Sequence, residues 1–216
     1  MRIQKVKRDL TFGEEIANSV SHGLSAFLMM ALSPVIAVYS YVKTNDLLFV
    51  FSLTVFTLSL TLMFLSSTIY HIMQHDTMHK DVLRILDHIF IYVAIAGSYT
   101  PIGLCIIGGW LGITLVVLQW TMVIFGILYK SLVKKSMPKL SMAIYIIMGW
   151  LAILIIPQLF VSANIVIVVL IFLGGLFYTI GAVLYAKQFK YAHFVWHLFV
   201  ILGAMTHVIA NVFFAF

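Results

Sequence analysis

The fold is decided by the stretch at residues 48–72, LFVFSLTVFTLSLTLMFLSSTIYHI. It contains no Lys, Arg, Asp or Glu, and its single histidine, His71, lies next to the end. A helix needs ~20 apolar residues to cross the ~30 Å hydrocarbon core of a bilayer. This stretch is long enough, so we predict that it is a membrane-spanning helix.

Six further segments of similar length and composition flank it. They lie near residues 19–42, 84–105, 108–129, 140–159, 163–186 and 192–214. Of the 216 residues, 63% are hydrophobic and only 9% are charged, and the mean hydropathy of +1.11 is far above that of water-soluble proteins. We therefore predict an all-α polytopic membrane protein, with a charged cytoplasmic or interfacial segment at 1–18 and one seven-helix transmembrane domain at 19–216.

The basic residues predict how this bundle is oriented. Twelve of the thirteen Lys and Arg residues fall in the N-terminal segment and the second, fourth and sixth loops, whereas only Lys43 falls on the other side. Cytoplasmic segments of membrane proteins carry the excess of Lys and Arg. The N-terminus is therefore expected in the cytoplasm and, with seven spans, the C-terminus outside.

Several function classes are disfavoured by composition. The net charge of +6 comes from short basic clusters between apolar segments, which indicates membrane topology rather than nucleic-acid binding. The single cysteine, Cys105, cannot form an intrachain disulfide. The apolar stretch from about 20 to 42 is too long for a signal peptide and is expected to be retained as the first helix.

Histidines at one predicted membrane depth suggest a metal site. His193-Phe-Val-Trp-His197 begins the last apolar segment, and its four-residue spacing places both imidazoles on one helical face. Ser67 and His71 share the same spacing, and with Asp87 they are expected at the same cytoplasmic end. Ionisable groups in a membrane bundle are costly unless they face one another. We predict a Zn²⁺ ion on three histidines; the alternative is that they only anchor helices at the headgroup level.

Three imidazoles and one open position are the ligand set of catalytic zinc, which activates water and polarises a carbonyl. Such a site suits hydrolysis of an amide or ester. Asp87 is then expected to orient a ligand or act as general base. Ser67 is either catalytic or bonded to a carbonyl of its own helix. Residue types alone leave iron and cobalt open.

A polar stripe at the start of the first span points to the same site. Glu15-x-x-Asn18-x-x-x-His22 places three polar groups on roughly one helical face, and we expect them to support the metal site without binding the ion. His75 is expected to emerge into the following loop. His207 lies about 15 Å deeper than His197 along the last helix and is expected to bond within the core.

These motifs, in this order, resemble the signature of the hemolysin III proteins, the bacterial branch of the progestin and adiponectin receptor superfamily, which is related to membrane ceramidases. The motifs are Glu15-x-x-Asn18-x-x-x-His22, Ser67-x-x-x-His71, Asp87, Gly97-Ser-Tyr-Thr-Pro101 and His193-x-x-x-His197. The resemblance covers essentially the whole chain. It implies seven helices, a cytoplasmic N-terminus, zinc on His71, His193 and His197, and polar roles for Ser67 and Asp87.

Three functions are consistent with these features. The first is zinc-dependent hydrolysis of a membrane lipid amide or ester. The second is a non-enzymatic membrane sensor or homeostasis protein that zinc stabilises, and the third is cytolysis, which the family name suggests. We expect a multi-pass protein of the bacterial plasma membrane with a membrane lipid as its substrate or ligand and no nucleic-acid partner. The oligomeric state is not predicted.

Overall fold

The computed structural model describes residues 10–75, 77–132, 138–187 and 189–215, and within these ranges the chain is helical with no strand. Seven of its helices are long and apolar enough to cross a membrane, as predicted. The spans are α1 (Phe12–Thr44), α2 (Leu47–Ile72), α3 with the π-helix η1 (Met78–Pro101, Ile102–Ile107), α4 (Gly109–Leu132), α5 with the 3₁₀ helix η2 and α6 (Pro138–Trp150, Leu151–Ile155, Ile156–Ser162), α7 (Ile165–Ala186) and α8 (Ala192–Phe213).

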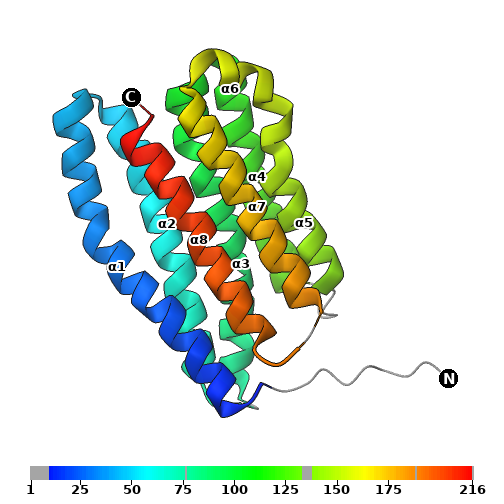
Figure 1. Cartoon of the computed structure of the whole chain (residues 1–216). Helices are drawn as coiled ribbons and strands as arrows, with labels where there is room; N and C mark the ends of the chain where they lie inside the picture. Colours follow the sequence, from blue (N-terminus) through cyan, green and yellow to red (C-terminus); the bar gives the residue numbers. More distant parts are fainter. Residues whose placement is uncertain (1–9, 76, 133–137, 188, 216) are drawn as a thin grey trace.

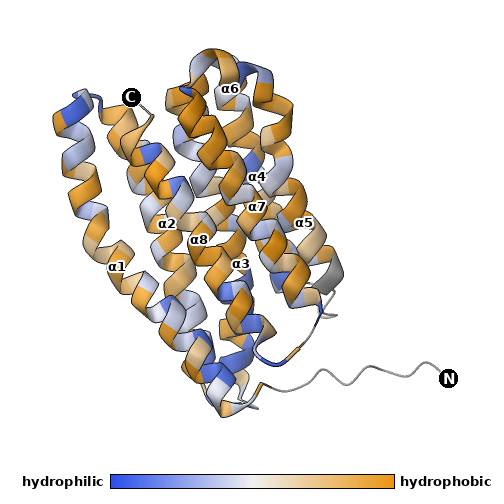
Figure 2. Cartoon of the chain, in the orientation of Figure 1, coloured by the Kyte–Doolittle hydropathy of each residue, from blue (hydrophilic) through white to orange (hydrophobic). Residues whose placement is uncertain are grey.

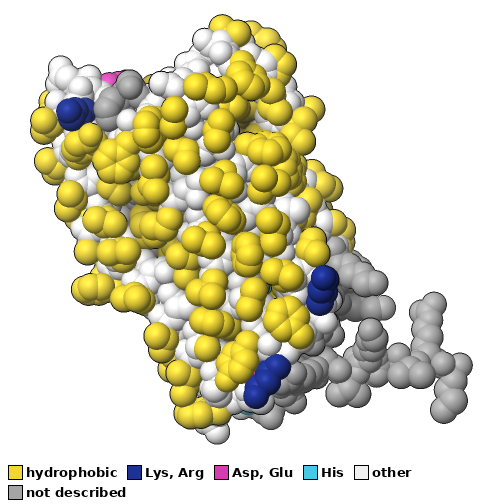
Figure 3. Space-filling model, viewed as in Figure 1, with side chains coloured by type: hydrophobic (Ala, Val, Ile, Leu, Met, Phe, Trp, Pro, Cys, Tyr) yellow, Lys and Arg dark blue, Asp and Glu magenta, His cyan; other side chains and the backbone are white. Residues whose placement is uncertain are grey.

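The helices form one bundle in which the start of α1 and the end of α8 lie at opposite ends (Figure 1). Helix α2 packs extensively on α1 and α3, and α8 packs on α7, whereas α5 touches α7 only sparingly. Hydrophilic residues gather toward the helix ends, most densely where α1 begins (Figure 2). The face shown in Figure 3 is covered with hydrophobic side chains. This surface matches a bundle whose outer face contacts lipid tails.

Helix α1 begins earlier than the predicted span. Thr11 and Glu14 form a capping box at its start, in which the Thr11 backbone N–H donates to Glu14 Oε2 over 2.9 Å. From Phe12 onward the charged segment is therefore helical and continuous with the first span, while 1–9 lie outside the described residues. This continuity places the polar stripe inside the bundle.

The Gly97-Ser-Tyr-Thr-Pro101 motif fixes how α3 meets its neighbours. A Cβ atom on Gly97 would lie 2.5 Å from the Ser59 Oγ atom of α2, so only glycine permits this close crossing. The Trp120 indole of α4 donates to the Thr100 hydroxyl over 3.2 Å. The π-helix η1 follows directly after Pro101. The motif is thus the packing centre of α2, α3 and α4.

The fifth span is interrupted in the middle by the 3₁₀ helix η2. The Tyr99 hydroxyl of α3 sits at this break, where it donates to the Gly149 carbonyl over 2.7 Å and accepts from the Ala152 backbone N–H over 2.8 Å. A break inside a membrane helix frees backbone groups that need other partners. Tyr99 supplies them and holds the broken helix as one wall of a cavity.

Candidate metal centre

The structure brings together the three predicted ligands. His71 at the end of α2 and His193 and His197 at the start of α8 each offer one ring nitrogen, and these three atoms lie within 4.8 Å of one another. His71 and His197 are buried, and His193 is half-buried. More than 120 residues of sequence separate α2 from α8 at this point, so the fold creates the cluster.

The first helix orients two of these rings. His71 Nδ1 contacts Glu15 Oε2, and His197 Nδ1 lies 3.2 Å from the Asn18 backbone oxygen. Metal-binding histidines usually donate their second ring N–H to such an oxygen. His71 Nε2 is buried and has no hydrogen-bond partner among the described residues. The donor set therefore fits a metal ion such as zinc, which tetrahedral nitrogen ligands bind well.

His22 lies directly beside the cluster. Its ring stacks on the His197 ring with centroids 3.6 Å apart and an interplanar angle of 5°. The His22 ring also forms an edge-to-face contact with the Phe64 ring of α2, with centroids 5.0 Å apart. Together with Glu15 and Asn18, the whole predicted stripe on α1 thus contacts His71 or His197 of the cluster.

Glu15 forms a buried ion pair with Lys80 that was not predicted from the sequence. Lys80 at the start of α3 donates through Nζ to Glu15 Oε1 over 2.7 Å and to the Met73 carbonyl at the end of α2 over 3.0 Å. Its side chain is only 8% exposed, although its sequence position suggested a loop charge. His75 Nε2 also lies 3.0 Å from Glu15 Oε1, with a half-exposed ring. One carboxylate thus joins α1, α2 and α3 at the metal centre.

Glu14 fixes the other side of the centre. It is 2% exposed, and its Oε1 atom accepts from the Tyr191 backbone N–H over 2.8 Å. Tyr191 precedes α8 in a left-handed conformation with φ of 62°. Glu14 was not predicted from the sequence, where the capping-box pattern Thr11-x-x-Glu14 is the signal that could have indicated it. The contact ties the start of α1 to the start of the helix that carries His193.

Ser67 and Asp87 lie together near the histidines. The structure gives an interaction between the Ser67 side chain and the half-buried Asp87 carboxylate. The flanking hydroxyls behave differently, because Ser66 donates to the Met63 carbonyl and Thr68 donates to the Phe64 carbonyl of their own helix. Both Ser67 and Asp87 line the same cavity as His193 and His197.

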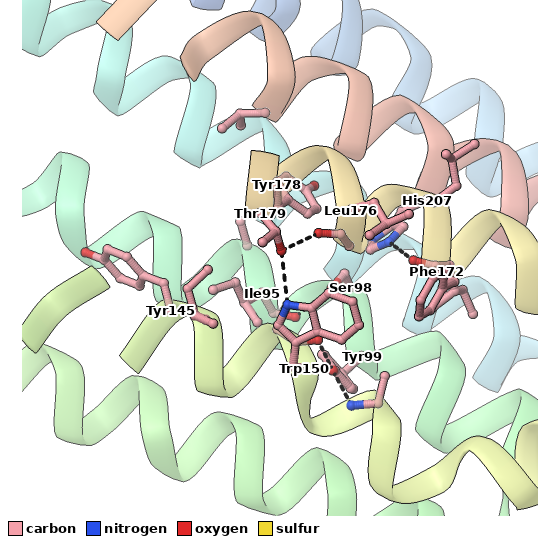
Figure 4. Close-up of a pocket in the computed structure, with 18 of the residues that line it drawn as sticks. Ile95, Ser98, Tyr99, Tyr145, Trp150, Phe172, Leu176, Tyr178, Thr179 and His207 are labelled. Atoms are coloured by element: carbon pink, nitrogen blue, oxygen red, sulfur yellow. Dashed lines mark hydrogen bonds between the residues drawn. The ribbon is translucent and has the colours of Figure 1, made fainter. Parts of the chain in front are cut away.

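This cavity has a volume of about 620 Å³ and extends from the histidine cluster deep into the bundle. Its wall is largely apolar and comes from α3, the broken fifth span, α7 and α8 (Figure 4). Pockets of this size and character bind small molecules. His207 also lines this cavity, and its Nε2 donates to the Ile171 carbonyl over 3.1 Å, so the predicted core bonding of His207 is confirmed.

The fold and the site define a class: a multi-pass membrane protein of seven helices with a buried cluster of three histidines beside an apolar cavity. The model of the haemolysin-III-related family matches residues 10–208, and the chain belongs to this family. The predicted resemblance is thereby confirmed.

Curated relatives agree with this assignment. The chain is 38% identical over 197 residues to the hemolysin-3 homolog of Bacillus subtilis (strain 168), covering 90% of this chain and 91% of the relative. It is 36% identical over 192 residues to hemolysin-3 of Bacillus cereus, covering 88% and 87%. The human monocyte to macrophage differentiation factor is 28% identical over 166 residues, covering 72% and 67%. No solved structure matches the chain.

Proposed function

We propose that this protein is a zinc-dependent hydrolase of a membrane lipid amide or ester, acting at the cytoplasmic leaflet of the bacterial plasma membrane. One observation carries the proposal. The apolar cavity of about 620 Å³ is lined at one end by His193 and His197 and also by Ser67 and Asp87. The cavity in which a lipid chain fits is therefore lined by two of the histidines, a carboxylate and a hydroxyl.

Each residue has a defined role in this proposal. His71, His193 and His197 hold the ion, and Glu15 and the Asn18 carbonyl fix the rings of His71 and His197. When bound, zinc supplies Lewis acidity, which polarises a carbonyl and activates water. Asp87 accepts the proton that the attacking water loses and returns it to the departing amine or alcohol.

Ser67 positions the Asp87 carboxylate through their interaction. The apolar wall of the cavity holds the acyl chain and keeps bulk water from the reaction. The substrate reaches the site from the bilayer, because the face of the bundle shown in Figure 3 is apolar and α5 touches α7 only sparingly.

A second function, a zinc-stabilised sensor or homeostasis protein, is favoured by a different observation. His71 lies on α2 and its two partners lie on α8, and these helices otherwise touch sparingly. A metal ion would link them and hold the bundle together. Cytolysis is suggested by the name of the family and by the names of the relatives from Bacillus, and none of the contacts described for this site favours it.

Hydrolysis assays on the purified protein in lipid nanodiscs separate these functions. A panel of lipid amides and esters is compared for the wild type, Asp87→Asn and the control Asp81→Asn. Asp81 is an exposed carboxylate on the same helix that pairs with Arg84. We expect Asp87→Asn to keep its zinc and lose at least 100-fold in rate, as removal of a general base typically does, while Asp81→Asn stays active. A wild type that hydrolyses none of the panel but loses thermal stability on chelation would favour the sensor.

A further inference from the structure

Tyr178 of α7 is a polar group in the wall of the cavity. It is half-buried, and its ring makes an edge-to-face contact with the His207 ring, with centroids 5.6 Å apart and an interplanar angle of 74° (Figure 4). Phenols in apolar surroundings usually hydrogen-bond through their hydroxyl. The partner of this hydroxyl is therefore informative.

The position of the Tyr178 ring requires a glycine at residue 203 of α8. A Cβ atom on Gly203 of α8 would lie 2.9 Å from the Tyr178 Cε1 atom, so the ring packs directly on the α8 backbone. The neighbouring His207 needs Gly174 in the same way, because a Cβ atom there would lie 2.3 Å from His207 Nε2. The absence of a side chain at these two glycines thus leaves space for two polar rings between α7 and α8.

The other hydroxyls in this part of the wall are already bonded to protein. Thr179 accepts from the Trp150 indole over 3.0 Å and donates to the Gly175 carbonyl over 2.8 Å. Ser98 donates to the Ile95 carbonyl over 2.7 Å. By contrast, no residue in the described part of the chain hydrogen-bonds to the Tyr178 hydroxyl.

We propose that the Tyr178 hydroxyl binds an oxygen atom in the middle of a lipid acyl chain, so that the cavity prefers chains oxygenated at mid-length. This inference rests on the proposed function, because both require that a lipid chain binds in the cavity. A polar group inside a membrane bundle is costly unless it is paired or functional. A chain hydroxyl or carbonyl would pair with this phenol in an otherwise apolar space.

The position of Tyr178 sets where the chain oxygen falls. Gly203, on which its ring packs, is six residues beyond His197 along α8, and His207 is ten residues beyond it. At a helical rise of 1.5 Å per residue these positions lie about 9 and 15 Å from the metal centre. With its carbonyl at the histidines, an extended chain passes Tyr178 roughly seven to twelve carbons from that carbonyl.

Competition binding on the protein in nanodiscs tests this preference without any hydrolysis. Tritiated octadecanoic acid is displaced by unlabelled octadecanoic, 2-hydroxyoctadecanoic or 10-hydroxyoctadecanoic acid. We expect the 10-hydroxy acid to bind about 3- to 10-fold more tightly than the other two, the value of one net hydrogen bond. In Tyr178→Phe, which keeps the ring and removes the hydroxyl, this preference disappears and octadecanoic acid binds as before. The control Thr179→Val, which removes a hydroxyl that is already paired, retains it.

Equal binding of the three acids by the wild type would overturn the inference, and so would an unchanged preference in Tyr178→Phe. Failure of all three acids to bind would overturn it as well, because the cavity then takes no chain. The measurement is repeated on His193→Ala. Retained preference without metal would leave this inference standing even if the proposed hydrolase activity fails.

Discussion

The Glu15 carboxylate on α1 contacts the Nδ1 atom of His71 on α2, 56 residues later in the chain. The same carboxylate binds Lys80 through its second oxygen. Glu15 therefore links a candidate metal ligand on α2 to the Lys80 charge at the start of α3. Glu15 is therefore expected to affect zinc affinity, and Lys80 is expected to affect the free energy of unfolding.

Replacing Glu15 by Gln should lower zinc affinity about 10- to 100-fold, as loss of an oxygen that orients a ligand histidine typically does. The neutral amide keeps the size of the side chain but holds the His71 ring less strongly. Competition with a chromogenic chelator measures the affinity. The control is Asp46→Asn, which keeps its side-chain cap of α2 at the other end of the helix. Equal affinities in Glu15→Gln and wild type would show that Glu15 does not orient His71.

Replacing Lys80 by Met should lower the free energy of unfolding by about 3 kcal/mol, because it leaves a buried carboxylate without its cation. Adding Glu15→Gln should recover part of that loss, since the two residues are in direct contact. Thermal unfolding in detergent follows the single and double variants. Lys187→Met, at an exposed lysine, serves as the control. Strictly additive effects would contradict a direct pairing.

Replacing Gly97 by Ala should destabilise the bundle by roughly 1–3 kcal/mol, the usual cost of overpacking. The added Cβ atom would lie 2.5 Å from Ser59 Oγ on α2. Removing the opposing side chain with Ser59→Gly should restore part of the stability, as judged by melting temperature. Gly149→Ala is the matched control, because nothing lies within 4 Å of a Cβ atom there.

The orientation of the bundle is tested by reporter fusions. A reporter that is active only in the cytoplasm should give no signal when fused after Phe216 and should give a signal when inserted within residues 130–139, between the fourth and fifth spans. The twelve-to-one distribution of Lys and Arg is the physical reason. The reverse pattern would place the metal centre at the outer leaflet.

The spans and the pair of His193 and His197 were predictable because they depend on local patterns, whereas the approach of His71 to this pair was inferred from its predicted membrane depth. Apolar length gave seven spans, and four-residue spacing placed His193 beside His197 on one face. The stripe from Glu15 to His22 was also predicted from local spacing, and each of its members contacts His71 or His197 of the cluster.

The features that the sequence did not reveal depend on packing between distant segments. The position of Lys80 in the sequence indicates a charge in a loop. In the structure, α1 and α3 pack together and bury Lys80 against Glu15, which is 65 residues away in the chain. Nothing in the sequence around Tyr99 predicts that its hydroxyl bonds to the backbone of the broken fifth span, 50 residues later in the chain. The cavity likewise arises only where the walls from α3, α5, α7 and α8 come together.

The metal content and coordination of the protein purified in detergent test the three-histidine site most directly. We predict about one zinc ion per chain, with X-ray absorption showing three histidine nitrogens and one exchangeable oxygen. Each of the changes His71→Ala, His193→Ala and His197→Ala should remove most of the zinc, whereas Asp87→Asn should leave it bound. Zinc content that survives the double change at His193 and His197, or a spectrum without histidine nitrogen, would contradict the central claim.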